Sequence, residues 1–399
     1  MHKLKHLVST IIASTLPYFV ALLWPLNIAH RALTSGSSTK RVLLVSRNSI
    51  AADHLVCISE LLHSIDNTQQ WVTTDRFPSR GFDRHAASAI VQVPAVHIFT
   101  ALISHWDLII FTNHPYGFGV CLPPWQKKLY INHGMHTGKI NTDHEEDGVY
   151  GKSKVTRPFG RPFYDCMFAA SYSEKEFALA QTPELDGSIA VAGFLQADRF
   201  LQAAREQPEK ARQKLGLNSK RKVVHIISTW GSHSLYATHG ASLLAELDAL
   251  RKDYEFVVSI HPRYDDLGNN GSERRAVILK RFEEAGAIVN HELDWHDYVI
   301  GADAAISDHS SLCLYHVLLG HPLLLVDVAQ DQFVAGSTFD TLQKNNQRLT
   351  LQTDLYAALQ TLTAEDARSH AQSRQANLLD YQGTAHTRYL QEIEKLLDC

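Results

Sequence analysis

Short apolar runs alternate with segments of helical periodicity along most of the chain. The runs that indicate strands are 41–46, 71–74, 86–91, 108–112, 128–132, 167–170, 189–192, 223–228, 256–260, 288–289, 304–306 and 323–326. Helical patterns fall between many of them, at 55–65, 98–105, 173–180, 240–254 and 273–285. Ser173 and Glu176 are placed as a capping box for one of these helices. Strands separated by helices of this length predict parallel βαβ units, and therefore an α/β fold.

The pattern changes between residues 196 and 222, where the chain is polar, charged and helical in period. A single core rarely grows beyond roughly 250–300 residues, so two domains are expected. We predict two Rossmann-like, doubly wound domains at 40–195 and 196–370, facing each other across a cleft and binding ligands at the carboxyl ends of their strands. The remaining tail, 371–399, is expected to end in an amphipathic closing helix with these residues on one face: Tyr389, Ile393, Leu396 and Leu397.

Composition narrows the classes of function. A net charge of -4 gives no support for a nucleic-acid partner. The five cysteines are scattered without a CxxC pair, which argues against a disulfide framework or a zinc site and fits a reducing compartment. There is no HExxH motif, and the closest histidine pairs, His133/His136 and His291/His296, lack a supporting set of ligands. We expect neither a metal nor a cofactor.

The N-terminal segment 1–35 stands apart because residues 7–29 carry no charged side chain. The run is long enough to span a bilayer, but Pro17 and Pro25 disfavour a straight helix. A cleaved signal peptide, a single membrane span and a buried core helix are alternatives. We favour a membrane-dipping or interfacial segment, which would hold the protein at the cytoplasmic face of the inner membrane, peripheral or anchored. Basic residues flank it: Lys3, Lys5, Arg31, Lys40 and Arg41.

The segment from residue 301 to 327 reads as strand, turn, helix, turn and strand. Asp308 and Ser310 follow the first apolar run and are favourable helix N-cap residues. Apolar side chains then recur at helical spacing until Gly320, which is expected to end the helix. A hydroxyl-rich turn at the start of a helix offers donors and a positive dipole end. The turn from Asp308 to Ser311 is therefore a candidate phosphate site.

A second polar cluster follows the predicted strand 128–132. It begins at His133 and Gly134 and continues to Lys139. Glycine lets the backbone approach a ligand, and a histidine at the end of a strand is suited to act as a general base near neutral pH. Taken alone, a His-Gly pair is equally consistent with an ordinary turn.

Two further clusters follow the strands of the second half. His261 and Arg263, with a proline between them, place an imidazole and a guanidinium where they could stabilise charge on a transferring phosphoryl group. Thr229 belongs to a hydroxyl-rich strand exit that could touch phosphate or ribose. The alternative is that these side chains satisfy local backbone or are solvated.

Together these segments resemble the CDP-glycerol glycerophosphotransferase family of teichoic-acid and capsule synthesis. That family carries a Trp-His-Gly-Thr-Pro-Leu-Lys segment, an apolar strand ending in His-Pro-Arg, and a Thr-Asp-Tyr-Ser-Ser segment. Residues 132–139, 260–263 and 307–311 take those places here, in the same order and at compatible spacing. The resemblance covers the chain from about residue 129 to its C-terminus.

The resemblance implies a GT-B-like fold and transfer of glycerol phosphate from CDP-glycerol to a polymer or lipid-linked acceptor, with release of CMP. It implies that His133 deprotonates the acceptor hydroxyl and that His261 stabilises the phosphoryl group in transit. The expected substrate-binding residues are Gly134, Lys139, Thr229, Arg263, Asp308, Ser310 and Ser311.

Departures from the family's pattern leave alternatives open. Met135 and His136 replace its Thr-Pro, Gly231 replaces an arginine, and residues 314–316 lack its acidic side chain. A related CDP-polyol donor is one alternative. A GT-B nucleotide-sugar glycosyltransferase or epimerase is another. A catalytically silent member that binds a glycan or a partner is a third.

Overall fold

The computed structural model describes residues 22–74, 83–115, 121–132, 134–135, 138, 140, 148–157, 160–218, 220–262, 275–292, 294–363 and 378–398. The chain divides into two compact units. The N-terminal unit comprises Met1–His133, Tyr150–Gln196 and Asp380–Cys399, and the C-terminal unit comprises Gly134–Val149 and Ala197–Leu379. Within the described residues each unit contains a six-stranded parallel sheet, so the predicted α/β class with two parallel-sheet domains is confirmed.

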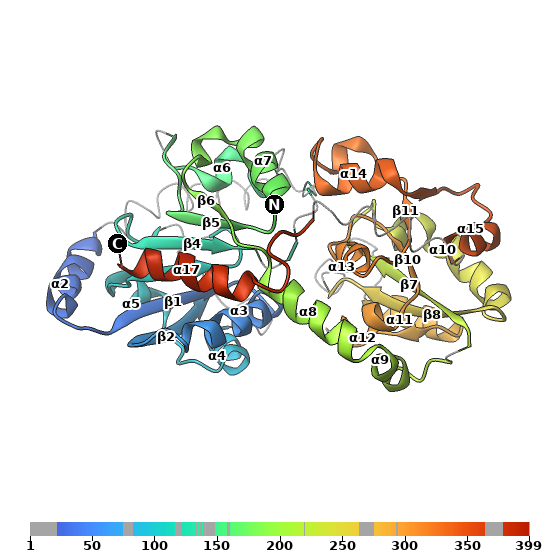
Figure 1. The fold of residues 1–399 in the computed structure, drawn as a ribbon, viewed down its shortest axis with the longest axis horizontal. Coiled ribbons are helices and arrows are strands. Elements are labelled where there is room, and N and C mark those ends of the chain that lie inside the picture. The colour runs from blue at the N-terminus through green and yellow to red at the C-terminus, as the bar shows by residue number, and fades with distance from the viewer. Residues whose placement is uncertain are drawn as a thin grey trace, which may run out of the picture. The chain divides into compact units, whose positions relative to one another are not determined.

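The sheet of the N-terminal unit has the strand order β2-β1-β3-β4-β5-β6 (Figure 1). Its strands are β1 (Lys40–Ser46), β2 (Thr68–Thr74), β3 (Leu108–Phe111), β4 (Lys127–Ile131), β5 (Cys166–Ala169) and β6 (Ile189–Val191). The connecting helices are α3 (Ser49–Leu62), α4 (Arg84–Val91), α5 (Ile98–Ile103), α6 (Lys152–Val155) and α7 (Tyr172–Gln181). The strand order reverses between β1 and β3, since the chain leaves β1 to one side for β2 and returns to its other side.

A helix from the far end of the chain completes the core of this unit. Helix α17 (Ala385–Asp398) lies along the N-terminal sheet in Figure 1. Tyr389, Ile393 and Leu397 are buried in the cluster that also contains the apolar residues of β1, and Tyr389 packs edge-on against Phe168 with ring centroids 4.7 Å apart. The amphipathic helix predicted at the tail is therefore present, and it belongs to the N-terminal unit.

The sheet of the C-terminal unit has the strand order β12-β11-β10-β7-β8-β9 and reverses between β7 and β10. Its strands are β7 (Lys222–Ser228), β8 (Tyr254–Ile260), β9 (Ile288–Val289), β10 (Ala304–Ser307), β11 (Leu323–Val326) and β12 (Gln347–Leu349). Its helices are α10 (Leu235–Leu250), α11 (Arg275–Glu284), α12 (His296–Gly301), α13 (Leu312–Leu318), α14 (Thr338–Asn345) and α15 (Leu355–Leu362). Strand β12 was not predicted because its first two residues are polar and exposed, which leaves no apolar run to detect.

Helices α8 (Leu195–Glu206) and α9 (Pro208–Lys214) occupy the polar stretch that was expected between the halves. The units divide between Gln196 and Ala197, next to the expected boundary. Segment 134–149, which was placed in the N-terminal domain, groups with the C-terminal unit. The reason is hydrogen bonding between residues distant in sequence: the Ile140 N–H donates to the Gln332 carbonyl and the Val334 N–H to the Gly138 carbonyl, each at 2.9 Å.

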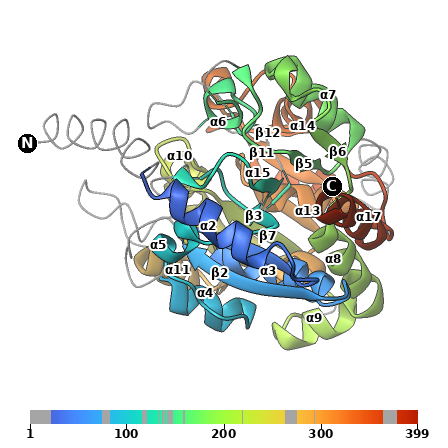
Figure 2. The ribbon, with the colours of Figure 1, turned by 90° about the vertical axis from the view of Figure 1, so that its left-hand side faces the viewer.

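Helix α2 (Trp24–Thr34) lies on the N-terminal unit beside α5 (Figure 2). Pro25 occupies its first turn, where a missing N–H costs no hydrogen bond. In the ranges that the structure describes, no helix is long and apolar enough to cross a membrane. Residues 1–21, which hold most of the predicted membrane-associating segment, lie outside these ranges.

The predicted start of α7 was wrong by two residues. The helix is capped by Ser171, whose Oγ accepts the N–H of Glu174 at 3.1 Å, and not by Ser173. The Glu174 carboxylate accepts the Ala170 N–H at 2.6 Å and the Tyr150 hydroxyl at 2.7 Å. This buried carboxylate therefore closes the capping box earlier than the sequence pattern indicated.

Candidate active site at the carboxyl edge of the C-terminal sheet

Three of the sequence-predicted residues follow adjacent strands of the C-terminal sheet. Thr229 comes after β7, His261 after β8 and Asp308 after β10, and β7 lies between the other two strands. The register pairs Ser228 with Ile260, and the last residue of β10 with Ile227, so the loops leave the sheet at nearly the same level. Ligands of open α/β sheets bind where the strand order reverses, which here is between β7 and β10.

The Asp308 carboxylate ties these loops together. It is fully buried, and its two oxygens accept the Thr229 N–H at 2.8 and 3.1 Å. It also accepts the N–H of Leu235, the first residue of α10, at 2.7 Å and the N–H of Ser310 at 3.0 Å. Because an ionised carboxylate is a strong acceptor of backbone N–H groups, one side chain holds the β7 loop, the start of α10 and its own turn in fixed positions.

The turn after Asp308 presents one hydroxyl outward and one inward. Helix α13 begins at Leu312, and its N-cap is Ser311, whose side chain makes no capping hydrogen bond to a described residue. The Asp308 oxygens are taken by the β7 loop, α10 and the Ser310 N–H, so the prediction that Asp308 caps this helix is wrong. The Ser310 hydroxyl does accept the N–H of Leu312, at 3.4 Å, although the N-cap position itself is Ser311. Ser310 is buried and Ser311 is exposed, so Ser311 is the hydroxyl that an incoming ligand can reach directly.

The segment that follows the predicted general base passes beside this turn. A side-chain carbon placed on Gly134 would lie 3.9 Å from Oγ of Ser311. Gly138 has a φ of 85°, and a side chain there would overlap Ser337. At Gly138 the absence of a side chain therefore lets the backbone run close against Ser337, whereas the contact at Gly134 is an ordinary one. His133 and Lys139, the predicted functional residues of the segment, lie outside the described residues.

His261 is half-buried, and its N–H donates to the Ser228 carbonyl at 2.9 Å, which continues the pairing of β8 with β7. Next to it the buried guanidinium of Arg275 donates to the Ile260 carbonyl at 2.9 Å and to the His291 carbonyl at 2.8 Å. It also donates to the carbonyls of residues 290 and 292. Arg275 thus holds the end of the strand that presents His261.

Sequence reasoning missed Arg275. An arginine at the start of a helix is normally expected to be solvated. The carbonyl partners of Arg275 lie at the end of β8 and in the residues that follow β9, which are separate in the sequence. The predicted partner Arg263 lies outside the described residues.

A chain of buried histidines runs through the core behind the site. His225 Nδ1 lies 3.0 Å from His316 Nε2, and His316 Nδ1 lies 3.0 Å from His321 Nδ1. His225 Nε2 lies 2.9 Å from Oγ of Ser259. Burial, followed by the neighbouring imidazole, lowers the pKa of His225 and of His316 well below the ordinary value, so both are neutral at neutral pH. The sequence could not indicate this chain, because its members come from separate elements.

The N-terminal sheet has its own polar cluster, which the sequence analysis also missed. His114, after β3, stacks on Tyr130 with ring centroids 4.6 Å apart, and its Nδ1 lies 2.9 Å from the Tyr164 hydroxyl. Arg47, after β1, donates to the His114 carbonyl. Strands β1 and β3 flank the point where the order of this sheet reverses, so these residues stand where a ligand of the N-terminal unit is expected.

The described part of the C-terminal site offers an exposed hydroxyl, a half-buried imidazole and a rigid backbone, which suits it to phosphate-bearing ligands. Over the same described ranges, no group of three or more His, Cys, Asp or Glu side chains could hold a metal ion. The structure brings together Gly134, Thr229, His261 and the turn from Asp308 to Ser311. Their action on a substrate stays a prediction.

Comparisons with known proteins address the fold and the family. The wall teichoic acid polymerase TagF is 14% identical to this chain, with a TM-score of 0.61 over 98% of each chain. MnaA of S. aureus, solved with UDP, is 12% identical, with a TM-score of 0.57 over 90% of this chain and 97% of its own. HepE of Anabaena, solved with UDP and glucose, is 12% identical, with a TM-score of 0.53 over 90% of this chain and 100% of its own. These likenesses show a fold similar to that of TagF, which is GT-B-like.

No curated protein sequence matches this chain. The profile of the family described as CDP-Glycerol:Poly(glycerophosphate) glycerophosphotransferase matches residues 39–393. The match spans both sheets and every predicted site residue. The chain therefore belongs to the CDP-glycerol:poly(glycerophosphate) glycerophosphotransferase family and is a glycerophosphotransferase-like enzyme.

Proposed function

We propose that this enzyme transfers glycerol phosphate, or a related polyol phosphate, from a CDP-activated donor to a polymer or lipid-linked acceptor and releases CMP. The observation that carries the proposal is the convergence of Thr229, His261 and the Asp308 turn at the reversal of a parallel sheet, in a chain of this family. TagF, which has a similar fold, was solved after soaking with CDPG.

In the proposed reaction the acceptor hydroxyl attacks the phosphorus that bears the glycerol. A new oxygen–phosphorus bond forms, the bond from this phosphorus to the CMP oxygen breaks, and CMP leaves with its electron pair. His133 takes the proton of the attacking hydroxyl. Phosphoryl transfer depends on positioning and on stabilising charge on the phosphoryl oxygens, which His261 and Arg263 would provide.

Asp308 has a different role from the serines that follow it. Its carboxylate accepts hydrogen bonds from Thr229, Leu235 and Ser310 and is buried, so it is a positioning residue. Ser311, with an exposed hydroxyl beside Gly134, is suited to contact the donor phosphates directly. Lys139 would add positive charge from the same segment.

The proposed acceptor belongs to a cell-surface polymer of the teichoic-acid or capsule type, carried on a membrane lipid. The enzyme would work at the cytoplasmic face of the membrane, where nucleotide-activated donors are available. The uncharged run 7–29 supports this location on sequence grounds.

A nucleotide-sugar reaction is the second candidate. It is favoured by the UDP in two proteins of similar fold, MnaA and HepE. Such an enzyme would attack a sugar carbon instead of phosphorus and release UDP.

To test this, the purified protein is incubated with a lipid-linked acceptor and with CDP-glycerol, CDP-ribitol or UDP-sugars. The release of CMP and of UDP is then measured. We expect CMP from a CDP-polyol, reduced by about 100-fold or more in His133→Ala and in His261→Ala. His63→Ala, at an exposed histidine after α3, is the matched control and should retain activity. UDP release would replace the proposal with the nucleotide-sugar reaction, and donor binding without turnover would indicate a silent member of the fold.

A further inference from the structure

Two tyrosines and an arginine form a cluster on the surface of the N-terminal unit. Tyr172 is the first residue of α7 and is 55% exposed, and its hydroxyl lies 2.8 Å from that of Tyr381, which is half-buried and precedes α17. The two rings are inclined by 51° to each other, with centroids 6.3 Å apart. The Arg388 guanidinium, from α17, stands over the Tyr381 ring, 4.7 Å from its centroid. Aromatic surface left exposed in this way marks a candidate interaction site.

The cluster lies on the side of the sheet where ligands bind. Helix α7 begins just after β5 ends, at the carboxyl edge of the N-terminal sheet, and open parallel sheets bind ligands at that edge. The segment before α17 is fixed at the same place. The Asp380 N–H donates to the Ala170 carbonyl at 2.9 Å, and the Asp380 carboxylate accepts the Tyr172 N–H at 2.7 Å. Two segments that are distant in the sequence are therefore joined at this edge.

The backbone of Tyr381 is held in an unfavourable conformation. Its φ is 55°, in the left-handed region that bulky residues rarely adopt. Its carbonyl accepts the Thr384 N–H at 2.9 Å and the Thr384 hydroxyl at 3.0 Å. Gly193 leaves room for the segment, since a side-chain carbon on it would lie 3.4 Å from Cβ of Tyr381. Such strain is concentrated at ligand sites, and here it accompanies the contact with Tyr172.

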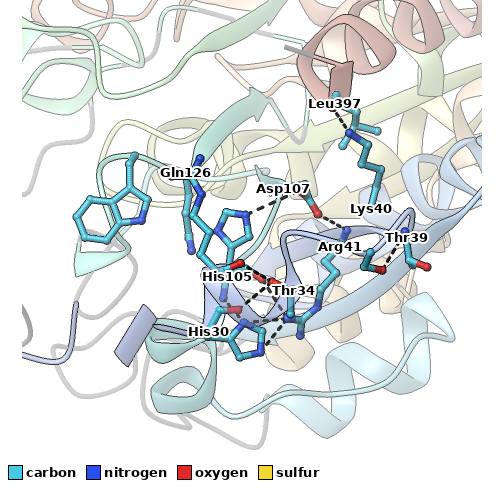
Figure 3. A network of polar contacts seen from close by, with 12 residues as sticks. His30, Thr34, Thr39, Lys40, Arg41, His105, Asp107, Gln126 and Leu397 are labelled. Carbon is cyan, nitrogen blue, oxygen red and sulfur yellow. Dashed lines mark hydrogen bonds and ion pairs between the residues drawn. The ribbon is translucent and has the colours of Figure 1, made fainter. Parts of the chain in front are cut away.

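Helix α17 fixes the position of Arg388. Tyr389 and Ile393 of this helix are buried in the core of the N-terminal unit. At its far end, Nζ of Lys40 donates to the Leu397 carbonyl at 2.6 Å (Figure 3). The helix cannot shift without disrupting these contacts, so the guanidinium is in place before a ligand binds. Groups that need no rearrangement bind a ligand at a lower entropic cost.

We propose that Tyr172, Tyr381 and Arg388 bind an uncharged saccharide unit of the acceptor. The exposed face of an aromatic ring is apolar and electron-rich, and the C–H bonds of a sugar ring pack against such a face. Tyrosine hydroxyls and guanidinium N–H groups can then form hydrogen bonds with the hydroxyls of the sugar. The inference rests on the proposed function and adds to it the chemical class of the acceptor unit that the N-terminal unit recognises.

Charge favours an uncharged sugar over a phosphate-bearing chain at this cluster. The N–H groups at the start of α7 are the usual place for a phosphate, but carboxylates already occupy them. Tyr172 donates to Asp380 at 2.7 Å, and Ala170 donates to Glu174 at 2.6 Å. A phosphate would therefore meet two acidic side chains beside a single guanidinium. The exposed residues that follow the two tyrosines are uncharged: Ser173 and Gln382.

Saturation-transfer NMR measures binding to the full-length protein without any donor. The probes are N-acetylglucosamine and N,N′-diacetylchitobiose, both uncharged, with glycerol 3-phosphate as an anionic competitor. We expect both saccharides to bind and glycerol 3-phosphate not to displace them. Tyr172→Ala should weaken binding of the disaccharide about tenfold, because the exposed ring is removed. Tyr172→Phe keeps the ring and should weaken it by about twofold.

The matched control is Tyr356→Ala, at a tyrosine of α15 that is 44% exposed, and it should bind like the wild type. Circular dichroism checks the fold of each variant. The proposal is overturned if neither saccharide binds, if Tyr172→Ala binds them as well as the wild type, or if glycerol 3-phosphate displaces them. It is also overturned if Tyr172→Phe loses as much binding as Tyr172→Ala, since the tyrosine would then act only through its hydroxyl contact with Tyr381.

Release of CMP by the wild type is measured separately, with CDP-glycerol and an acceptor. Saccharide binding without turnover would contradict the proposed reaction and leave the saccharide site supported. Turnover without saccharide binding would contradict the site and leave the reaction supported. The two failures are therefore distinguished.

Discussion

At the scale of single residues, Asp308 shows how one buried carboxylate can organise a site. It accepts N–H groups from Thr229 and Leu235, which lie more than seventy residues away in the chain, as well as from Ser310. The side chain sits in the middle of the candidate site without being exposed to a ligand. Its effect on activity is therefore expected to pass through the backbone that it holds.

Asp308→Asn is expected to lower stability and activity together. The asparagine replaces one accepting oxygen with an NH₂ group that faces backbone donors, which should cost about 2–4 kcal/mol. Urea unfolding measures the change in the free energy of unfolding. Asp327→Asn is the control, because that exposed carboxylate accepts hydrogen bonds only from the side chains of Arg348 and Gln343 among the described residues, and its loss should change stability by less than about 1 kcal/mol. Equal effects of the two variants would contradict the role given to Asp308.

Because His225 and His316 are buried, we expect the free energy of unfolding to decrease at acidic pH. Their native pKa lies below the ordinary value of 6.5, so below that pH the unfolded chain binds protons that the native state does not. Stability attributable to them is therefore complete above about pH 6.5 and decreases as the pH falls. Each such histidine contributes a slope of about 1.4 kcal/mol per pH unit well below its unfolded pKa.

Urea unfolding at about pH 7.5 and about pH 5.5 checks this expectation, with the free energy of unfolding compared between the two conditions. His316→Gln cannot titrate and should reduce the pH dependence, whatever its effect on stability at neutral pH. His63→Gln, at an exposed position, is the matched control and should leave the slope unchanged. An unchanged slope in the His316 variant would show that these histidines are protonated in the native state.

At the scale of elements, Gly138 decides how closely segment 134–140 runs past Ser337, the N-cap residue of α14. Gly138 has a φ of 85° and lies against Ser337, and its carbonyl accepts the N–H of Val334. Gly216 has a φ of 69° but nothing within 4 Å of a side-chain carbon placed on it. Substitutions at these two glycines therefore distinguish the free-energy cost of the left-handed backbone conformation from the cost of a steric clash with a neighbouring side chain.

Gly138→Ala is expected to displace the segment that carries His133 and Lys139, and so to reduce turnover strongly, by about 100-fold. Gly216→Ala should cost about 1–2 kcal/mol of stability from its left-handed φ and leave turnover near that of the wild type. Turnover assays and urea unfolding on both variants make the comparison. If both lose activity to the same extent, the close approach at Gly138 has no role in the site.

At the scale of the whole molecule, the N-terminal unit combines segments that lie far apart in the chain. Helix α17 supplies Tyr389, Ile393 and Leu397 to the core of the N-terminal unit, and Lys40 at the start of β1 donates to the Leu397 carbonyl at 2.6 Å. The C-terminal unit is formed by Gly134–Val149 and Ala197–Leu379. The N-terminal unit therefore needs α17 to complete its core.

A chain that ends at residue 384 should lose protection from hydrogen exchange across the strands of the N-terminal unit and keep it in the C-terminal unit. The reason is that removing α17 exposes the sheet face around Phe168, which Tyr389 covers. Replacing a single large buried aromatic residue costs about 3–5 kcal/mol, and the truncation removes several buried side chains. Mass spectrometry of exchange in both units makes the measurement. Equal loss of protection in the two units would contradict this division.

Much of the fold could be predicted from local pattern. Parallel strands buried on both faces appear as continuous apolar runs, and the predicted runs lie within or beside a strand of the structure, except 86–91, which forms helix α4. The predictions that were wrong or missing depended on partners distant in sequence. The cap of α7 shifted because Glu174 bonds to Tyr150, and β12 went undetected because its pairing with β11 does not require an apolar run.

The sequence by itself determined the class of the fold, the strands and the order of the family's motifs, because these depend on periodicity and on residues close together in the chain. Only the tertiary structure decided what each site residue touches. It turned the Asp308 carboxylate toward Thr229 and α10, joined His225 to His316, and brought Tyr172 beside Tyr381. Hydrogen bonding and burial depend on which segments meet in space, and these tertiary contacts cannot be read from the order of residues along the chain.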